Sequence, residues 1–197
     1  MSEEKVLTKE IAEQFLADNG SVDLSEFTEI EDTAAESLSK YQGYLRLDGL
    51  TQLSDAAAES LSKFQGGYIE LNGLTELSDA AAESLGNFQD GNIELNGLTE
   101  LSDAAAESLS KYQVDSLSLN GLTQLSDAAA ESLSKFQGGN IELSGLTELS
   151  DAAAISLSKY GGAELYLSGL TELSDAAAWI LSQRENIYLP YAADEDD

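Results

Sequence analysis

Carboxylates and tyrosines are the side chains that could do chemistry in this sequence, and many of them recur at a spacing of 24 residues. The chain carries 37 Asp and Glu residues and 8 Tyr residues, but no His and no Cys. This composition removes the histidine base, the thiolate nucleophile, the disulfide and the usual zinc site. Two kinds of chemistry remain: hydrolysis by paired carboxylates, and recognition by acidic and aromatic side chains.

Catalysis by paired carboxylates requires a pocket that raises the pKa of one acid above that of the other. One recurring set of glutamates belongs to segments that we expect to be open helix surface: Glu59, Glu83, Glu107 and Glu131. No motif joins a serine to a base. We therefore predict that the chain is not an enzyme and that it uses no cofactor.

A second recurring set of acidic and aromatic side chains lies in short segments where apolar and polar residues alternate, as in Leu45-Arg46-Leu47. This period of two predicts strands. Stacked strands would place their outward residues in columns about 4.8 Å apart. The central column reads Asp23, Arg46, Glu70, Glu94, Ser118, Glu142, Tyr166 and Tyr188, and the column before it reads Ser21, Tyr44, Tyr68, Asn92, Ser116, Asn140, Glu164 and Asn186.

This strand face is the candidate partner-binding surface, because tyrosine brings a large and rigid contact area at low entropic cost. The predicted binding residues are Tyr44, Tyr68, Arg46, Glu70, Glu94, Glu142, Tyr166 and Tyr188. The ordinary preference of aromatic residues for strands is an equally good explanation of the tyrosines. The central column places Arg46 between Asp23 and Glu70, and it leaves Glu70 beside Glu94 as an unrelieved like-charge pair.

A third column follows the strands and reads Asp48, Asn72, Asn96, Asn120, Ser144 and Ser168. These side chains could form a ladder of hydrogen bonds or offer weak oxygen ligands to a cation. We favour the ladder, because no single turn concentrates carboxylates as calcium loops do. No metal site is predicted.

The elements that position these columns come from one repeated block, Gly-Leu-Thr-(Glu/Gln)-Leu-Ser-Asp-Ala-Ala-Ala, which begins at Gly49, Gly73, Gly97, Gly121, Gly145 and Gly169. After each strand, Ser54 and its equivalents supply a helix N-cap, and Ala57, Ala58, Leu61 and Phe64 recur at helical spacing. We expect a helix of about 18 Å that ends at Gly66-Gly67. The prediction is an α/β solenoid with a parallel sheet and right-handed crossovers.

Leu-x-Leu strands followed by Leu-x-Asp-x-x-Ala-x-x-Leu helices resemble the leucine-rich repeats, in particular the bacterial, ribonuclease-inhibitor-like and planctomycete-type 24-residue repeats. The resemblance covers residues 7 to 189. It implies a sheet on the concave face, short helices on the convex face, and a protein-interaction role through the concave sheet. The chain departs from the family where the usual asparagine after the strand is replaced by Leu50, Leu74, Leu98, Leu122, Leu146 and Leu170.

The two ends of the repeat array differ from its middle. We expect an N-terminal capping helix in residues 1–20, the solenoid in 21–185, a last strand and cap in 186–191, and a disordered acidic tail in 192–197. On the helix side, the glutamate column changes to Ile155 and then Trp179, with Ile180 beside it. We favour a cap over this apolar patch, in which the tail around Tyr188 to Tyr191 folds back; an oligomer contact is the alternative.

Net charge limits the possible partners. The formal charge is -28, so nucleic acid and anionic membrane surfaces would repel the chain. No basic, apolar leader and no membrane-length apolar run is visible, which favours the cytoplasm. We expect a protein partner bound by a scaffold module. The alternative is a structural or surface repeat protein, salt-adapted or a designed consensus, without a specific ligand.

Overall fold

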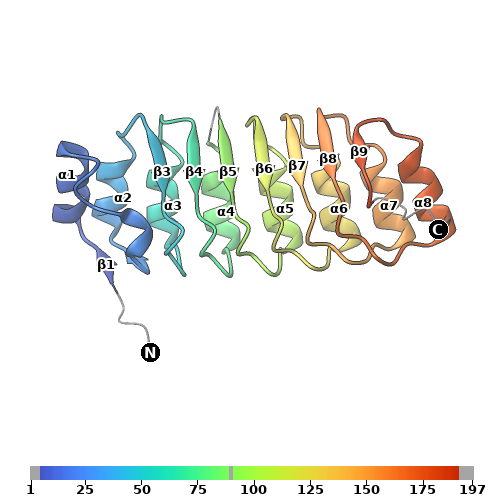
Figure 1. Cartoon of the computed structure of the whole chain (residues 1–197), viewed down its shortest axis with the longest axis horizontal. Coiled ribbons are helices and arrows are strands. Elements are labelled where there is room, and N and C mark those ends of the chain that lie inside the picture. Colours follow the sequence, from blue (N-terminus) through green and yellow to red (C-terminus); the bar gives the residue numbers. More distant parts are fainter. Residues whose placement is uncertain (1–4, 89–90, 191–197) are drawn as a thin grey trace, which may run out of the picture.

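The computed structural model describes residues 5–88 and 91–190, and in them the repeat forms a two-layer α/β solenoid. Figure 1 shows the strands side by side in one layer and the helices in a second layer, with α1 and α8 at opposite ends of the long axis. The described helices are α1 (Lys9–Ala17), α2 (Asp32–Leu38), α3 (Asp55–Leu61), α4 (Asp79–Leu85), α5 (Asp103–Leu109), α6 (Asp127–Leu133), α7 (Asp151–Leu157) and α8 (Asp175–Ser182), with a 3-10 turn at Leu24–Glu26. The predicted fold class is confirmed.

The main sheet is parallel and runs in sequence order from β3 to β9. Its strands are β3 (Tyr44–Arg46), β4 (Tyr68–Glu70), β5 (Asn92–Glu94), β6 (Ser116–Ser118), β7 (Asn140–Glu142), β8 (Glu164–Tyr166) and β9 (Ile187–Tyr188). A separate pair, β1 (Val6–Leu7) and β2 (Glu29–Ile30), lies at the N-terminal end. Equivalent residues of successive repeats pair directly, as Leu45 does with Ile69, so the predicted columns have the expected register from β3 onward.

The core lies between the two layers. The middle residue of each strand from Leu45 to Leu165 is buried, and so are the paired alanines of each helix, such as Ala57 and Ala58. Small alanines let each helix lie close to the sheet. The leucines that replace the usual asparagine, such as Leu74, are also buried, so this position contributes apolar packing.

The helices are shorter than the sequence predicts. In α3 the Ser54 hydroxyl accepts a hydrogen bond from the Ala57 amide at 3.0 Å, as expected for an N-cap, but the helix ends at Leu61 rather than at Gly66. Beyond Ser62 the hydrogen bonds run between residues three apart, including one of 3.0 Å from the Phe64 amide to the Leu61 carbonyl. Such bonds tighten the chain into a turn, so Phe64 is buried by a turn and not by the helix face.

Each capping serine has a second role that the sequence analysis missed. The Ser102 hydroxyl caps α5 and donates to the Asp79 carboxylate of the preceding helix at 2.5 Å. The same bond joins neighbouring helices from Ser54–Asp32 to Ser174–Asp151. The serine–aspartate pair of the repeat therefore connects adjacent coils as well as beginning each helix.

The strand predicted at residues 21–23 does not form, so the predicted columns begin one repeat later, at β3. Residues 21–23 align in sequence with the strands, but they lie outside the sheet, and a 3-10 turn follows at Leu24–Glu26. Asp23 is the N-cap of this turn, and its carboxylate accepts hydrogen bonds from the amide and hydroxyl of Ser25. Ser21 and Asp23 are therefore not the first members of the two strand columns.

Within the described residues, none of the helices has the length and apolar character needed to cross a membrane.

Candidate functional site

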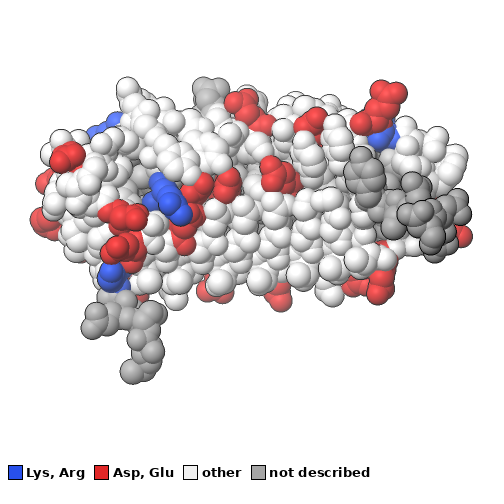
Figure 2. Space-filling model, in the orientation of Figure 1, with Lys and Arg blue, Asp and Glu red and all other residues white. Residues whose placement is uncertain are grey.

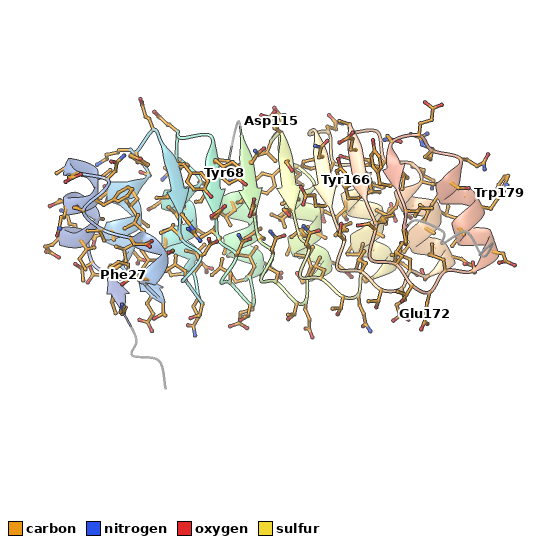
Figure 3. The ribbon with its side chains drawn as sticks, viewed as in Figure 1. Phe27, Tyr68, Asp115, Tyr166, Glu172 and Trp179 are labelled. Atoms are coloured by element: carbon orange, nitrogen blue, oxygen red, sulfur yellow. The ribbon has the colours of Figure 1, made fainter. Side chains whose placement is uncertain are left out.

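The sheet face, which consists of the outward side chains of β3–β9, carries the predicted binding residues. Figure 3 shows Tyr68 and Tyr166 over the strands, toward opposite ends of this face. Figure 2 shows more acidic than basic side chains in the same view. Tyrosines and carboxylates are thus brought together here, and the geometry at each end can be described separately.

At the N-terminal end, Tyr44 and Tyr68 form a ring pair with centroids 4.8 Å apart. The Tyr68 hydroxyl donates to the Glu94 carboxylate of the next strand, which also accepts a hydrogen bond of 2.9 Å from the Asn72 amide. The hydrogen bond to Glu94 and partial burial raise the pKa of Tyr68 above its ordinary value. Glu70 and Glu94 are neighbours as predicted, and the Glu94 charge contributes to raising the pKa of Glu70. The pair is not unrelieved, however, because Tyr68 and Asn72 donate to Glu94.

Arg46 contacts one of the two predicted acids, Glu70, but its second partner is Asp48 and not Asp23. Its Nε lies 2.9 Å from the Asp48 carboxylate and 3.4 Å from that of Glu70. Burial and the nearby Asp48 carboxylate raise the pKa of Glu70. Burial also acts to raise the pKa of Asp48, but hydrogen bonds from Arg46 and Asn72 outweigh this effect, and the pKa of Asp48 is lowered. Arg46 therefore bridges Asp48 of its own repeat and Glu70 of the next repeat. Asp23 acts on it only as a more distant charge.

At the C-terminal end, Glu164 holds two tyrosines. Tyr166 and Tyr188 stack with ring centroids 4.9 Å apart and planes inclined by 13°. Their hydroxyls donate to the two oxygens of Glu164 at 2.5 and 3.0 Å. The hydrogen bond to Glu164 raises the pKa of Tyr166 to about 12, while these bonds lower the pKa of Glu164. The sequence places Glu164 in the column before the central one but does not predict it as a site residue. Its position directly beside Tyr166 and Tyr188 of the central column was the pattern that could have identified it.

In the middle of the sheet face, small polar residues bind the remaining carboxylate. The Asn120 amide and the Ser118 hydroxyl contact Glu142 at 2.8 and 3.0 Å, and Ser118 is buried. Glu142 thus has donors from the preceding repeat, as Glu94 does. The predicted face residues are all brought to one surface, but most already bind one another.

The column that begins at Asp48 forms a hydrogen-bond ladder. The side-chain oxygens of the first four members accept from the backbone amide one repeat later: Asp48 from Asn72 at 3.2 Å, Asn72 from Asn96 at 3.0 Å, Asn96 from Asn120 at 2.9 Å and Asn120 from Ser144 at 2.8 Å. At the end of the column the Ser168 hydroxyl donates to the Ser144 hydroxyl at 3.0 Å. This was the favoured interpretation of the column. Among the described residues, no group of three or more potential metal-binding side chains is found.

The helix face carries the other glutamates. Glu59, Glu107 and Glu131 each pair with a lysine four residues later, at 3.0, 3.2 and 2.9 Å, with both partners about two-thirds exposed. Position 87 is asparagine instead of lysine, and its amide donates to the Glu83 carbonyl at 3.1 Å. Exposed pairs of this kind stabilise a helix weakly, by about 0.3–0.5 kcal/mol each.

The apolar patch lies at the C-terminal end of the helix face, where Figure 3 shows Trp179 pointing outward. Trp179 is 65% exposed, Ile155 is 43% exposed and Ile180 is partly buried. Of the tail segment predicted to cover it, Tyr188 lies in β9 on the sheet face and Leu189 packs against the core. Tyr191, the predicted contact of Trp179, falls outside the described residues, as does the 192–197 tail.

Comparison of the chain with known protein families and with curated proteins found no match.

Proposed function

We propose that the chain is a non-enzymatic protein-interaction or scaffold module that binds a protein partner through the sheet face. The observation that carries this proposal is the pair of aromatic contacts near the two ends of the sheet, Tyr44 with Tyr68 and Tyr166 with Tyr188. The outer tyrosine of each pair stays accessible, since Tyr44 is 47% and Tyr188 is 43% exposed. Tyrosines with accessible ring faces are typical anchors of protein interfaces.

The charges of the sheet face favour a basic partner surface. Glu94, Glu142 and Glu164 lie among the tyrosines, and Arg46, the basic member of the central column, already contacts Asp48 and Glu70. Lysine or arginine side chains of a partner could contact both the carboxylates and the ring faces. The leucine-rich-repeat resemblance supports the same role; membership of that family and a cytoplasmic location stay predictions from the sequence.

The test is capture of a partner by the immobilised chain, followed by affinity measurements on variants. The double variant Tyr166→Ser with Tyr188→Ser should bind the captured protein at least about ten-fold more weakly, because it loses the stacked anchors at one end of the face. Glu59→Ser on the helix face is the matched control and should bind normally. Both variants should keep the wild-type circular dichroism spectrum. Normal binding by the double variant would remove the sheet face from the proposal.

A second function, a structural repeat protein without a specific ligand, is favoured by a different observation. The hydroxyls of Tyr68, Tyr166 and Tyr188 and the carboxylates of Glu94 and Glu164 already bind one another within the chain. Polar groups that are satisfied internally gain less from a partner. Failure to capture any partner, together with a strong dependence of stability on salt, would support this second function.

A further inference from the structure

Strand β3 has an unpaired edge. It pairs with β4 on one side, and residues 20–24, which pass its other side, make no backbone hydrogen bond to it in the described part of the chain. The Leu47 amide donates to the Glu70 carbonyl at 2.9 Å and so points toward β4. Successive residues of a strand point their backbone groups to opposite sides. The amide and carbonyl groups of Tyr44 and Arg46 therefore face the open edge.

A hollow of about 430 Å³ lies along this edge. Its lining is largely apolar and comes from Phe15, Val22, Leu24, Tyr41 and Tyr44, with Asn19, Asp23 and Arg46 at polar positions. Phe15 and Tyr41 meet edge to face with ring centroids 5.1 Å apart. A preformed apolar hollow beside free strand donors and acceptors suits a peptide that inserts a side chain while its backbone pairs.

The charges around the hollow favour a basic peptide. Arg46 contributes one positive charge, and it is already bound to Asp48 and Glu70. The Asp23 carboxylate adds a negative charge on the opposite wall. Three carboxylates against one guanidinium leave this end of the sheet negative, as the whole chain is at -28.

The opposite edge of the sheet is less suitable. Strand β9 is two residues long, and Pro190 follows it closely. Proline has no amide hydrogen to donate, and short edges ending in proline resist strand addition. The two edges of the sheet are therefore unequal, and β3 is the open one.

We propose that the N-terminal edge of the sheet binds an extended basic segment of a partner protein, which pairs with β3 as an added strand and places an apolar side chain in the hollow. This site is the strand edge and not the sheet face, so it stands independently of the function proposed above. A role for residues 20–24 follows: by leaving the sheet they keep the edge open.

The first test uses the full chain and three synthetic peptides with blocked ends. The probe alternates basic and aliphatic residues, Lys-Val-Lys-Leu-Lys-Val-Lys. One control replaces every lysine with glutamate, and the other keeps the sequence but carries methyl groups on its internal backbone nitrogens. Strand addition predicts binding of the probe and at least about ten-fold weaker binding of both controls, since one lost hydrogen bond or charge contact is worth about that factor. Equal binding of the methylated peptide would overturn the proposal.

The second test locates the peptide. On adding the probe, the amide protons of Tyr44 and Arg46 should shift in NMR spectra and exchange more slowly with solvent, while those of Tyr166 and Tyr188 should not change. Shifts spread over the carboxylates of the sheet face, without protection of the Tyr44 and Arg46 amides, would show simple charge attraction instead and would also overturn the proposal.

The third test compares Arg46→Pro with Arg46→Ala. Both variants lose the guanidinium, but only proline removes the amide that faces the open edge, and the pairing of Leu47 with β4 remains possible. We expect Arg46→Pro to bind the probe about ten-fold more weakly than Arg46→Ala. Equal affinities in two folded variants would contradict strand addition. If circular dichroism shows that Arg46→Pro does not fold, the methylated peptide and the amide protection decide the question.

Discussion

Tyr112 and Tyr160 occupy equivalent positions two repeats apart, but only one of their hydroxyls has a partner. The Tyr160 hydroxyl donates to the Gly139 carbonyl at 2.7 Å. The Tyr112 hydroxyl is buried and makes no hydrogen bond within the described residues. Burying a hydroxyl group without a hydrogen-bond partner costs more folding free energy than burying one that has a partner. Phenylalanine fills the same position at Phe64, Phe88 and Phe136, so the site accepts a ring without a hydroxyl.

We expect Tyr112→Phe to raise the free energy of unfolding by about 1 kcal/mol, because it removes an unsatisfied polar group. The matched variant Tyr160→Phe should lower it by about 1 kcal/mol, because it removes a hydrogen bond. Urea denaturation of both variants measures the difference. A loss of stability in Tyr112→Phe would show that its hydroxyl has a partner, such as an ordered water.

A second prediction at the residue scale concerns the hydrogen bond between Tyr166 and Glu164. The folded protein raises the pKa of Tyr166 from 10.0 to about 12 through the hydrogen bond to Glu164. A raised pKa means that this stabilising contribution is complete below pH 10 and is lost as the pH rises toward 12. Glu164→Gln should bring the pKa of Tyr166 closer to its ordinary value, as followed by NMR of the tyrosine ring. Glu172→Gln, a change at an exposed loop residue, is the control, and an equal effect of both variants would contradict the assignment.

At the scale of the elements, each coil lies very close to its neighbour at the glycine that begins the repeated block. A Cβ atom at Gly121 would lie 2.1 Å from the Asn96 carbonyl oxygen of the preceding coil. Backbone atoms cannot move aside as a flexible side chain can. The glycine is therefore required by the spacing of the coils and not by its own backbone conformation, since its φ is not in the left-handed region.

Gly121→Ala should destabilise the protein by about 3 kcal/mol, because the coils must separate to accept the methyl group. Gly161 is the matched control: a Cβ atom there would meet nothing within 4 Å. Gly161→Ala should leave stability within about 0.5 kcal/mol of wild type or raise it slightly. Thermal denaturation of the two variants measures the contrast, and equal effects would show that the coils are not in close contact at Gly121.

At the scale of the whole molecule, the charge of -28 acts on a stack of similar units. Weak, exposed lysine–glutamate pairs on the helix face relieve little of this repulsion. Salt at physiological strength screens charges beyond about 8 Å. We expect the melting temperature to rise from low to moderate sodium chloride concentration, as measured by circular dichroism. A flat or falling melting temperature would mean that self-repulsion does not limit stability.

The apolar patch at the end of the helix face gives the last prediction. Trp179 is the single tryptophan of the chain and is 65% exposed, so its fluorescence reports on this patch alone. We expect the red-shifted emission of an exposed indole and ready quenching by acrylamide in dilute solution. A blue-shifted emission that is independent of protein concentration would indicate a cap from the same chain. A blue shift that disappears on dilution would indicate contact with a second copy.

The sequence alone determined the repeating architecture. The 24-residue period and the period-two segments around residues such as Leu45 and Ile69 predicted a parallel sheet, and the structure has the expected pairing from β3 to β9. Ser54 and its equivalents likewise predicted where each helix begins. These features follow from local preferences repeated in every coil, so each unit supports the same conclusion about its neighbours.

Only the tertiary structure decided which polar groups pair and where the sheet begins. The sequence placed Arg46 between Asp23 and Glu70, and the structure keeps Glu70 but replaces Asp23 with Asp48. Tyr68 reaches Glu94 on the next strand. Several acids lie within a few ångströms of each donor, and the side-chain rotamers and the burial of each group determine which of them it binds. Residues 21–23 fit the strand pattern, but no strand of the main sheet precedes them, and the Asp23 turn satisfies polar groups there locally. An end of a repeat array lacks one neighbour, so the repeat pattern cannot predict its structure.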